Sequence, residues 1–102
     1  MRKYACKVDA NHGVIRQMYR DLGCSVADTF RLGSGFPDLV VALFGQTHLV
    51  EVKDGSRPPS ERKLTEDEIT FHNGWHAKVW VVKDIDGVIE HVNEIRRSHY
   101  ND

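Results

Sequence analysis

The sequence predicts a single α/β domain in which helices cover a mixed β-sheet. Near the N-terminus, apolar residues recur with helical spacing. In the middle of the chain, two apolar runs flank a tight turn, and further on a capped helix precedes another apolar run. The resulting order is helix, three strands, helix, strand and helix. Two antiparallel strands followed by a helical crossover into a last strand build an α/β sandwich with a mixed sheet.

Length and composition limit the classes of protein that need to be considered. With 102 residues, the chain forms one domain, residues 1–102, around one core. A net charge of −1 argues against nucleic-acid binding by bulk charge alone, but it permits a local basic groove. The chain has no apolar run of membrane-spanning length and no secretory leader, so we expect a cytoplasmic protein with Cys6 and Cys24 as free thiols.

The first third of the chain predicts a helix and a short strand. Residues 1–8 are expected to be a loosely held lead-in, and Asp9 or Asn11 is expected to cap a helix that ends near Leu22 at Gly23. The apolar stripe expected to face the core consists of Val14, Ile15, Met18 and Leu22. Residues 25–31 predict a strand, and the glycines of residues 32–36 predict a loop that a ligand can approach closely.

A hairpin follows, and its register determines which polar residues meet. A two-residue turn at Gly45-Gln46 places Lys53 opposite Asp38 and Glu51 opposite Val40. Asp38 and Glu51 then become diagonal neighbours on one face, with β-carbons roughly 7–8 Å apart, a span that two carboxylates can close around an ion. The other face carries Leu39, Val41, Leu43, His48, Val50 and Val52, so we expect a sheet covered on both sides.

The C-terminal half predicts a capped helix, a strand and a closing element. Thr65 followed by Glu68 fits a capping box at the start of a helix over residues 66–74. Residues 77–83 predict a strand, Asp86-Gly87 a turn, and residues 88–97 a helix or a strand plus helix. Trp75 and Trp80 are expected in the core. His72 and His76 lie four residues apart without a third ligand, so packing or surface roles are favoured.

The polar residues of the hairpin predict a hard-cation site. Asp38 and Glu51 supply carboxylate ligands, and the carbonyl of Val52 is a candidate third ligand. Oxygen ligands favour Mg²⁺ or Mn²⁺, and phosphodiester hydrolysis is a natural use of such an ion. Lys53 is placed to orient a water or to stabilise charge on phosphorus. Taken singly, Asp38 can also merely start a strand, and Glu51 and Lys53 can line an exposed edge.

These residues also carry a family resemblance. Pro37-Asp38 followed by Glu51-Val52-Lys53 resembles the PD-(D/E)XK nuclease signature. With the glycine loop before it and Lys63-Leu64-Thr65 after it, residues 9–83 resemble the VRR-NUC branch, which includes small standalone phage and bacterial proteins. The resemblance implies a restriction-endonuclease-like fold and divalent-metal cleavage of DNA. It also implies a homodimer that resembles Holliday-junction resolvases and acts in the cytoplasm of a bacterial or phage-infected cell.

The chain departs from the family pattern at two positions. Val14 stands where the family often carries a metal-directed Glu, so the outer metal shell is either thinner or supplied by Asp9 or Asn11. Glu68 stands where the family often has Gln, so Glu68 either serves the site or only caps its helix. Two alternatives stay open: a catalytically weakened DNA-binding module, or a nuclease directed at flaps, nicks or single strands. The candidate DNA contacts are Ser34, Gly35, Arg57, Arg62 and Lys63.

Overall fold

A computed structural model describes residues 9–101 and confirms the predicted α/β order; the lead-in expected at residues 1–8 lies outside that range. The elements are α1 (His12–Asp21), β1 (Ser25–Asp28), the 3₁₀ turn η1 (Phe30–Leu32), β2 (Leu39–Leu43), β3 (Gln46–Val52), the 3₁₀ turn η2 (Pro59–Glu61), α2 (Glu66–Gly74), β4 (Val79–Val82) and α3 (Ile85–Tyr100). The sheet runs β1-β2-β3-β4, with β4 parallel to β3 and the other pairs antiparallel. Within the described range, every helix is too short or too polar to cross a membrane.

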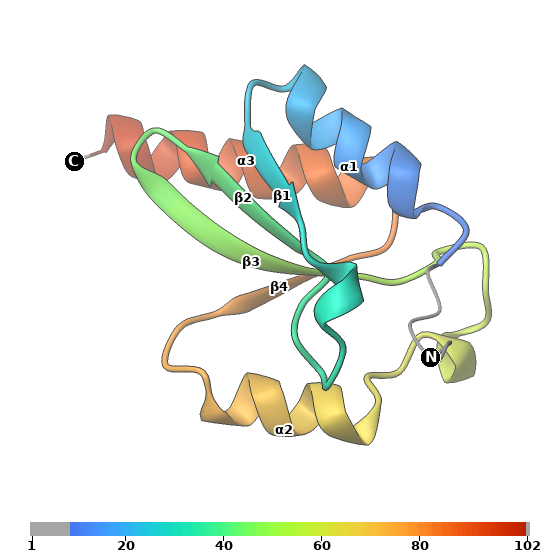
Figure 1. The fold of residues 1–102 in the computed structure, drawn as a ribbon. Helices are drawn as coiled ribbons and strands as arrows, with labels where there is room; N and C mark the ends of the chain where they lie inside the picture. Colours follow the sequence, from blue (N-terminus) through green and yellow to red (C-terminus); the bar gives the residue numbers. More distant parts are fainter. Residues whose placement is uncertain (1–8, 102) are drawn as a thin grey trace.

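The helices divide between the two faces of the sheet. Figure 1 shows α1 and α3 side by side on one face, whereas α2 lies on the opposite side of the strands. The alternation of side chains along β3 explains this division, because Val50 and Val52 point toward α1 and α3 while Glu51 points toward α2. The sheet is therefore covered on both sides, as the hairpin pattern predicted.

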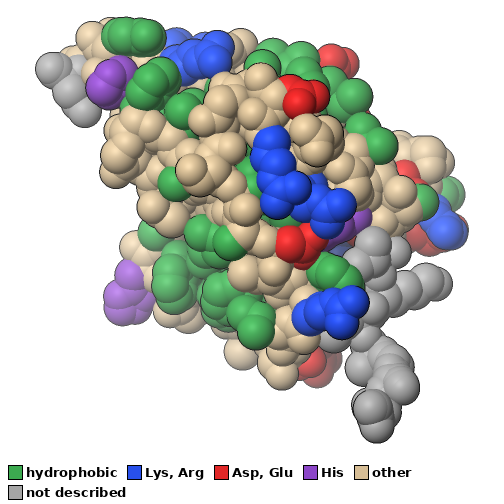
Figure 2. Space-filling model, turned by 45° about the horizontal axis from the view of Figure 1, so that its top comes forward, with side chains coloured by type: hydrophobic (Ala, Val, Ile, Leu, Met, Phe, Trp, Pro, Cys, Tyr) green, Lys and Arg blue, Asp and Glu red, His purple; other side chains and the backbone are tan. Residues whose placement is uncertain are grey.

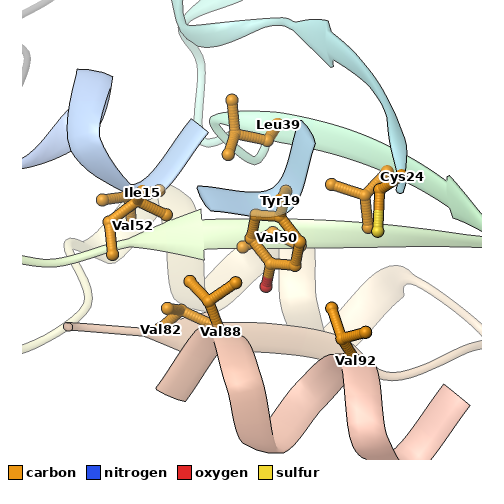
Figure 3. Packing of buried hydrophobic residues seen from close by; sticks show 10 residues of the cluster. Ile15, Tyr19, Cys24, Leu39, Val50, Val52, Val82, Val88 and Val92 are labelled. Carbon is orange, nitrogen blue, oxygen red and sulfur yellow. The ribbon is translucent and has the colours of Figure 1, made fainter. Parts of the chain in front are cut away.

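The core fills the space between the sheet, α1 and α3 (Figure 3). Its fully buried members come from all three elements: Ile15, Tyr19, Leu39, Val41, Val50, Val52, Val88 and Val92. Each buried aliphatic side chain contributes roughly 1.5–3 kcal/mol of hydrophobic free energy. This apolar layer holds the sheet in place, and with it the residues on its opposite face, such as Glu51.

The buried stripe of α1 differs from the predicted one. Tyr19 is fully buried, whereas Val14 is 55% exposed, so its place in the stripe was wrong. The helix is rotated so that Ile15 and Tyr19, rather than Val14, face the sheet. Gly23 has φ 97°, which confirms the left-handed closure of the helix. Cys24 is a buried free thiol, and Cys6 lies outside the described residues.

The hairpin turn sits one residue earlier than predicted. Leu43 pairs with Gln46, so the two-residue loop is Phe44-Gly45, whose φ angles of 52° and 77° match a type I′ turn. Leu39 accordingly pairs with Val50, and the next position outward sets Asp38 directly opposite Glu51. The diagonal relation was wrong, but the shift keeps both acids on the same face, so their predicted proximity holds.

Local capping explains the remaining differences and one close agreement. β1 ends at Asp28 rather than continuing to residue 31, because its carboxylate accepts from the Phe30 amide (3.3 Å) and starts η1. Asp84 caps α3 by accepting from the Gly87 amide (2.8 Å), so the predicted Asp86-Gly87 turn is the first turn of that helix. α2 has the predicted bounds and a complete capping box. Trp80 packs against the core, but Trp75 is 44% exposed, contrary to expectation.

Candidate active site

The open end of the hairpin holds the predicted site on the face that α2 covers. Asp38 lies immediately before β2, and its backbone carbonyl accepts from the Thr29 amide (2.9 Å). Its Oδ2 accepts from the Val52 amide (2.8 Å), which ties the two strands together across the site. Val52 therefore shows an amide contact to Asp38, and its side chain is buried in the core.

Glu51 is the most deeply buried acid of the site. Its residue is 1% exposed, and Oε1 is buried with no hydrogen-bond partner in the described part of the chain. Burial, together with the neighbouring carboxylates of Asp38 and Glu68, raises the pKa of Glu51 far above its ordinary value. A carboxyl group in this position is stable either when it is protonated or when a cation compensates its charge.

Lys53 is held next to Glu51 by Glu68. The Lys53 Nζ donates to Glu68 Oε1 at 2.8 Å, and both side chains are largely buried. Burial by itself lowers the pKa of Lys53, but the carboxylates of Glu68, Glu51 and Asp9 outweigh burial and raise it, so the ammonium stays charged. The same Glu68 oxygen accepts from the Thr65 amide (2.8 Å). Glu68 therefore both caps α2 and contacts the lysine of the site.

Asp9 adds a further carboxylate, whereas Asn11 has a structural contact. Burial raises the pKa of Asp9; the charge of Lys53 opposes this, and the charges of Asp38, Asp54 and Glu68 add to it. Asn11 occupies the N-cap position of α1 without capping it. Instead, its Nδ2 donates to the carbonyls of Lys53 (3.0 Å) and Lys83 (2.9 Å), which joins the ends of two strands.

His72 joins the site without having been predicted there. Its Nε2 lies 3.7 Å from Glu51 Oε1, and both atoms are buried without hydrogen-bond partners among the described residues. One sequence signal points to it: His72 follows Glu68 by four residues on a helix, so the two share one face. His76 is exposed beyond the end of α2, as expected for a surface histidine.

The donor set suits a hard divalent cation, although the side chains are not arranged as a closed metal site. The carboxyl groups of Glu51, Glu68 and Asp9 act on Lys53, Asp38 adjoins Glu51, and carboxylate oxygens are the ligands that Mg²⁺ and Mn²⁺ prefer. Within residues 9–101, no three His, Cys, Asp or Glu side chains are positioned together to hold a metal ion. The unpartnered Glu51 oxygen and the surplus of acids nevertheless fit a cation, which Asp38 and Glu51 would hold after side-chain rotation.

Some candidate DNA contacts are exposed, and others form an ion pair or pack against α2. Ser34 and Lys63 are exposed, whereas Arg57 pairs with Glu61 at 3.0 Å. A β-carbon added to Gly35 would lie 2.2 Å from the Asp67 carbonyl oxygen. Gly35 is therefore required for close packing against α2.

A cleft beside the site contains the best placed of the predicted basic residues. Arg62 lines a cleft of about 610 Å³ together with Lys53 and Lys83, and the Arg62 Nε is buried without a partner within the described range. Asp84, Asp86 and Glu90 line the other side. Figure 2 likewise shows one face on which Lys and Arg side chains lie next to Asp and Glu, without a continuous basic surface. Any phosphate contact therefore depends on a few individual cations.

Comparisons with known proteins leave the site to be judged by its own geometry. No protein-family model, curated protein or solved structure matches this chain.

Proposed function

We propose that this protein is a divalent-metal-dependent DNA endonuclease that hydrolyses phosphodiester bonds on a restriction-endonuclease-like core. One observation carries the proposal. The hairpin register sets Asp38 opposite Glu51, which is 1% exposed and whose Oε1 has no hydrogen-bond partner in residues 9–101. Lys53 follows on the same face and remains charged beside them. Two convergent carboxylates and an ammonium are the groups that metal-assisted cleavage of a phosphodiester requires.

Each residue has a distinct role in this proposal. A bound Mg²⁺ or Mn²⁺ would polarise the scissile phosphate and lower the pKa of a coordinated water. Asp38 and Glu51 hold the ion, and the Val52 amide keeps the Asp38 carboxylate facing Glu51. Lys53 stabilises negative charge that develops on the phosphate oxygens. Glu68 keeps the Lys53 ammonium from turning into solvent.

The proposed substrate is branched DNA such as a Holliday junction, and the proposed working form is a homodimer. The resemblance of residues 9–83 to standalone VRR-NUC proteins supports both points. One copy of this domain carries one candidate site, so symmetric cleavage of two strands needs two copies. Light scattering at working concentration tests the dimer, and a monomer would remove the argument from paired sites.

The decisive experiment combines two site variants with a panel of DNA substrates. Four-way junctions, flaps, nicked duplexes and single strands are incubated with Mg²⁺, Mn²⁺ or EDTA. Asp38→Ala and Lys53→Ala should each reduce cleavage by at least about 10³-fold, because each removes a group that acts at the reacting phosphate. DNA affinity and the unfolding transition should change little.

Asp21→Ala and Lys78→Ala are the matched controls, since both residues are exposed and distant from the site. Full activity in either site variant would refute the assignment. A wild-type protein that shifts branched DNA but never cuts it under any metal would instead identify a binding module. Cleavage confined to flaps, nicks or single strands would keep the chemistry and replace the proposed substrate.

A further inference from the structure

His72 and Glu51 bring two buried polar atoms together that have no hydrogen-bond partner among residues 9–101. Glu51 Oε1 and His72 Nε2 face each other at 3.7 Å, and the described residues offer neither atom a hydrogen bond. The Glu51 side chain is 2% exposed and that of His72 is 16% exposed. Leaving two such atoms unsatisfied costs about 1–3 kcal/mol each, so the arrangement requires an explanation.

The separation of the two atoms distinguishes the ways of completing the pair. A direct N–H···O hydrogen bond needs about 2.7–3.2 Å. A bridging water, with two hydrogen bonds of ~2.8 Å at a tetrahedral angle, would separate the atoms by ~4.5 Å. Two ligands at ~2.1 Å from one cation lie ~3.0 Å apart at right angles and ~3.4 Å apart in a tetrahedron. The observed 3.7 Å is within the range of an imidazolium–carboxylate ion pair, and it is also close to the separation of two ligands on a shared cation after a small inward shift.

The fold points this imidazole into the site from a well-anchored helix. His72 follows Glu68 by one turn of α2, so both side chains project toward the strand that bears Glu51 and Lys53. Phe71, the residue before it, packs edge-on against Phe36 with ring centroids 5.2 Å apart and stacks on Trp75 at 5.4 Å. These contacts fix the rotation of α2 about its axis, and with it the direction of His72.

We propose that His72 is a ligand, through Nε2, of the same divalent cation as Glu51, and that it biases the site toward Mn²⁺ or another transition-metal ion over Mg²⁺. The assignment rests on the proposed metal-dependent function and adds a ligand to it. Imidazole nitrogen suits transition metals, whereas Mg²⁺ prefers oxygen ligands and retains its waters. A site with carboxylates alone would not discriminate in this way.

Metal binding by the full chain, without DNA, tests this assignment. Free Mn²⁺ is titrated by electron paramagnetic resonance and Mg²⁺ by calorimetry for the wild type, His72→Ala, His72→Gln and the surface control His76→Ala. His72→Ala should weaken Mn²⁺ binding at least about 10-fold and Mg²⁺ binding less than about 3-fold. Bound Mn²⁺ should show nitrogen modulation in electron spin-echo spectra of the wild type and of His76→Ala, and that modulation should disappear in His72→Ala and His72→Gln.

The possible results separate this inference from the function on which it rests. Tight Mn²⁺ binding without nitrogen modulation, or with unchanged affinity in His72→Ala, overturns the His72 assignment and leaves the metal site standing. Equal losses of Mn²⁺ and Mg²⁺ affinity show that His72 only positions Glu51, which also overturns it. A wild type that binds neither ion overturns both proposals. Unfolding curves of the metal-free variants establish that each is folded, and His72→Gln preserves most of the side-chain volume if His72→Ala is unstable.

Discussion

β3 carries two buried polar clusters on opposite faces, and they differ in how completely they are bonded. On the α3 side, Tyr19 Oη lies 2.7 Å from His91 Nδ1, His91 Nε2 lies 2.7 Å from His48 Nδ1, and His48 Nε2 lies 3.1 Å from Gln46 Oε1. On the α2 side, Glu51 and His72 approach each other with both facing atoms unpartnered in the described structure. The two clusters lie on one strand and share its backbone.

The first cluster can be satisfied by a single direction of proton donation. Tyr19 donates to His91, His91 to His48, and His48 to Gln46, with both imidazoles neutral. Burial, together with the nearby charges of His48 and Lys78, lowers the pKa of His91 to about 3, so its ring stays neutral at ordinary pH. Trp80 stacks on His91 with centroids 4.0 Å apart. This cluster has the properties of a structural network.

The cluster of Glu51 and His72 has no such complete set of hydrogen bonds among the described residues, and the helix that covers it, α2, is less buried than α1 and α3. α2 contributes no fully buried residue, whereas α1 and α3 both do. Among the described residues, Glu51 has the carboxyl groups of Asp38 and Glu68 as neighbours, and Glu51 Oε1 and His72 Nε2 are buried without hydrogen-bond partners. A face that serves only stability would not retain such a cluster, because apolar residues of similar size are at least as stabilising. The contrast teaches that one face supports the fold and the other carries the candidate site.

Breaking the bonded cluster should produce the largest loss of stability. His91→Ala removes a buried ring and leaves the Tyr19 hydroxyl and His48 Nδ1 without partners, so we expect about 3 kcal/mol of destabilisation. Urea denaturation measures it, and Asn93→Ala, exposed on the same helix, should stay within about 0.5 kcal/mol of wild type. A cost below about 1 kcal/mol for His91→Ala would show that the network is not structural.

Replacing Glu51 by a neutral side chain should increase stability, whereas His91→Ala should decrease it. Without metal, Glu51→Gln should raise the unfolding free energy at pH 8 by about 1–3 kcal/mol, because the buried wild-type carboxyl must take up a proton on folding and glutamine need not. The folded-state pKa of Glu51 lies above its ordinary value of 4.5, so the folded state retains a proton that the unfolded chain has lost. Stability of the wild type should therefore fall as pH rises above about 4.5, and the variant should weaken this dependence.

Denaturation in EDTA across pH 5–9 tests this second prediction. Glu94→Gln is the matched control, since Glu94 is exposed on α3 and pairs with Arg97. A loss of stability in Glu51→Gln would mean that the Glu51 charge is already compensated within the protein. The hypothesis that Glu51 Oε1 lacks a compensating partner in the metal-free protein would then be wrong.

The smallest effects should separate the two contacts of Glu68. Thr65→Ala removes one half of the capping box and should cost about 1 kcal/mol while leaving cleavage nearly unchanged. Glu68→Gln keeps a capping side chain but replaces the ion pair with Lys53, so cleavage should fall about 10-fold with a smaller change in stability. Melting curves and cleavage rates are measured for both variants. If Glu68→Gln lowers the cleavage rate no more than Thr65→Ala does, Glu68 acts only as a cap.

Features with a local cause could be predicted from the sequence alone. The capping box placed α2 at its observed bounds, and Gly23 marked the end of α1. The period of two along a strand kept Asp38, Glu51 and Lys53 on one face even though the turn lies one residue earlier than expected. These signals depend on neighbours within a few positions, so they survive errors elsewhere in the chain.

Other features depend on how the elements pack. The rotation of α1, which buries Tyr19 and exposes Val14, is set by the sheet and α3 together, because both residues are apolar enough for either position. The contact of His72 with Glu51 and the charge interaction of Asp9 with Lys53 join segments far apart in the sequence. By itself the sequence determined the order of elements and the face that carries the acids. Only the tertiary structure decided which groups surround those acids, because burial and charge depend on every element packed against them.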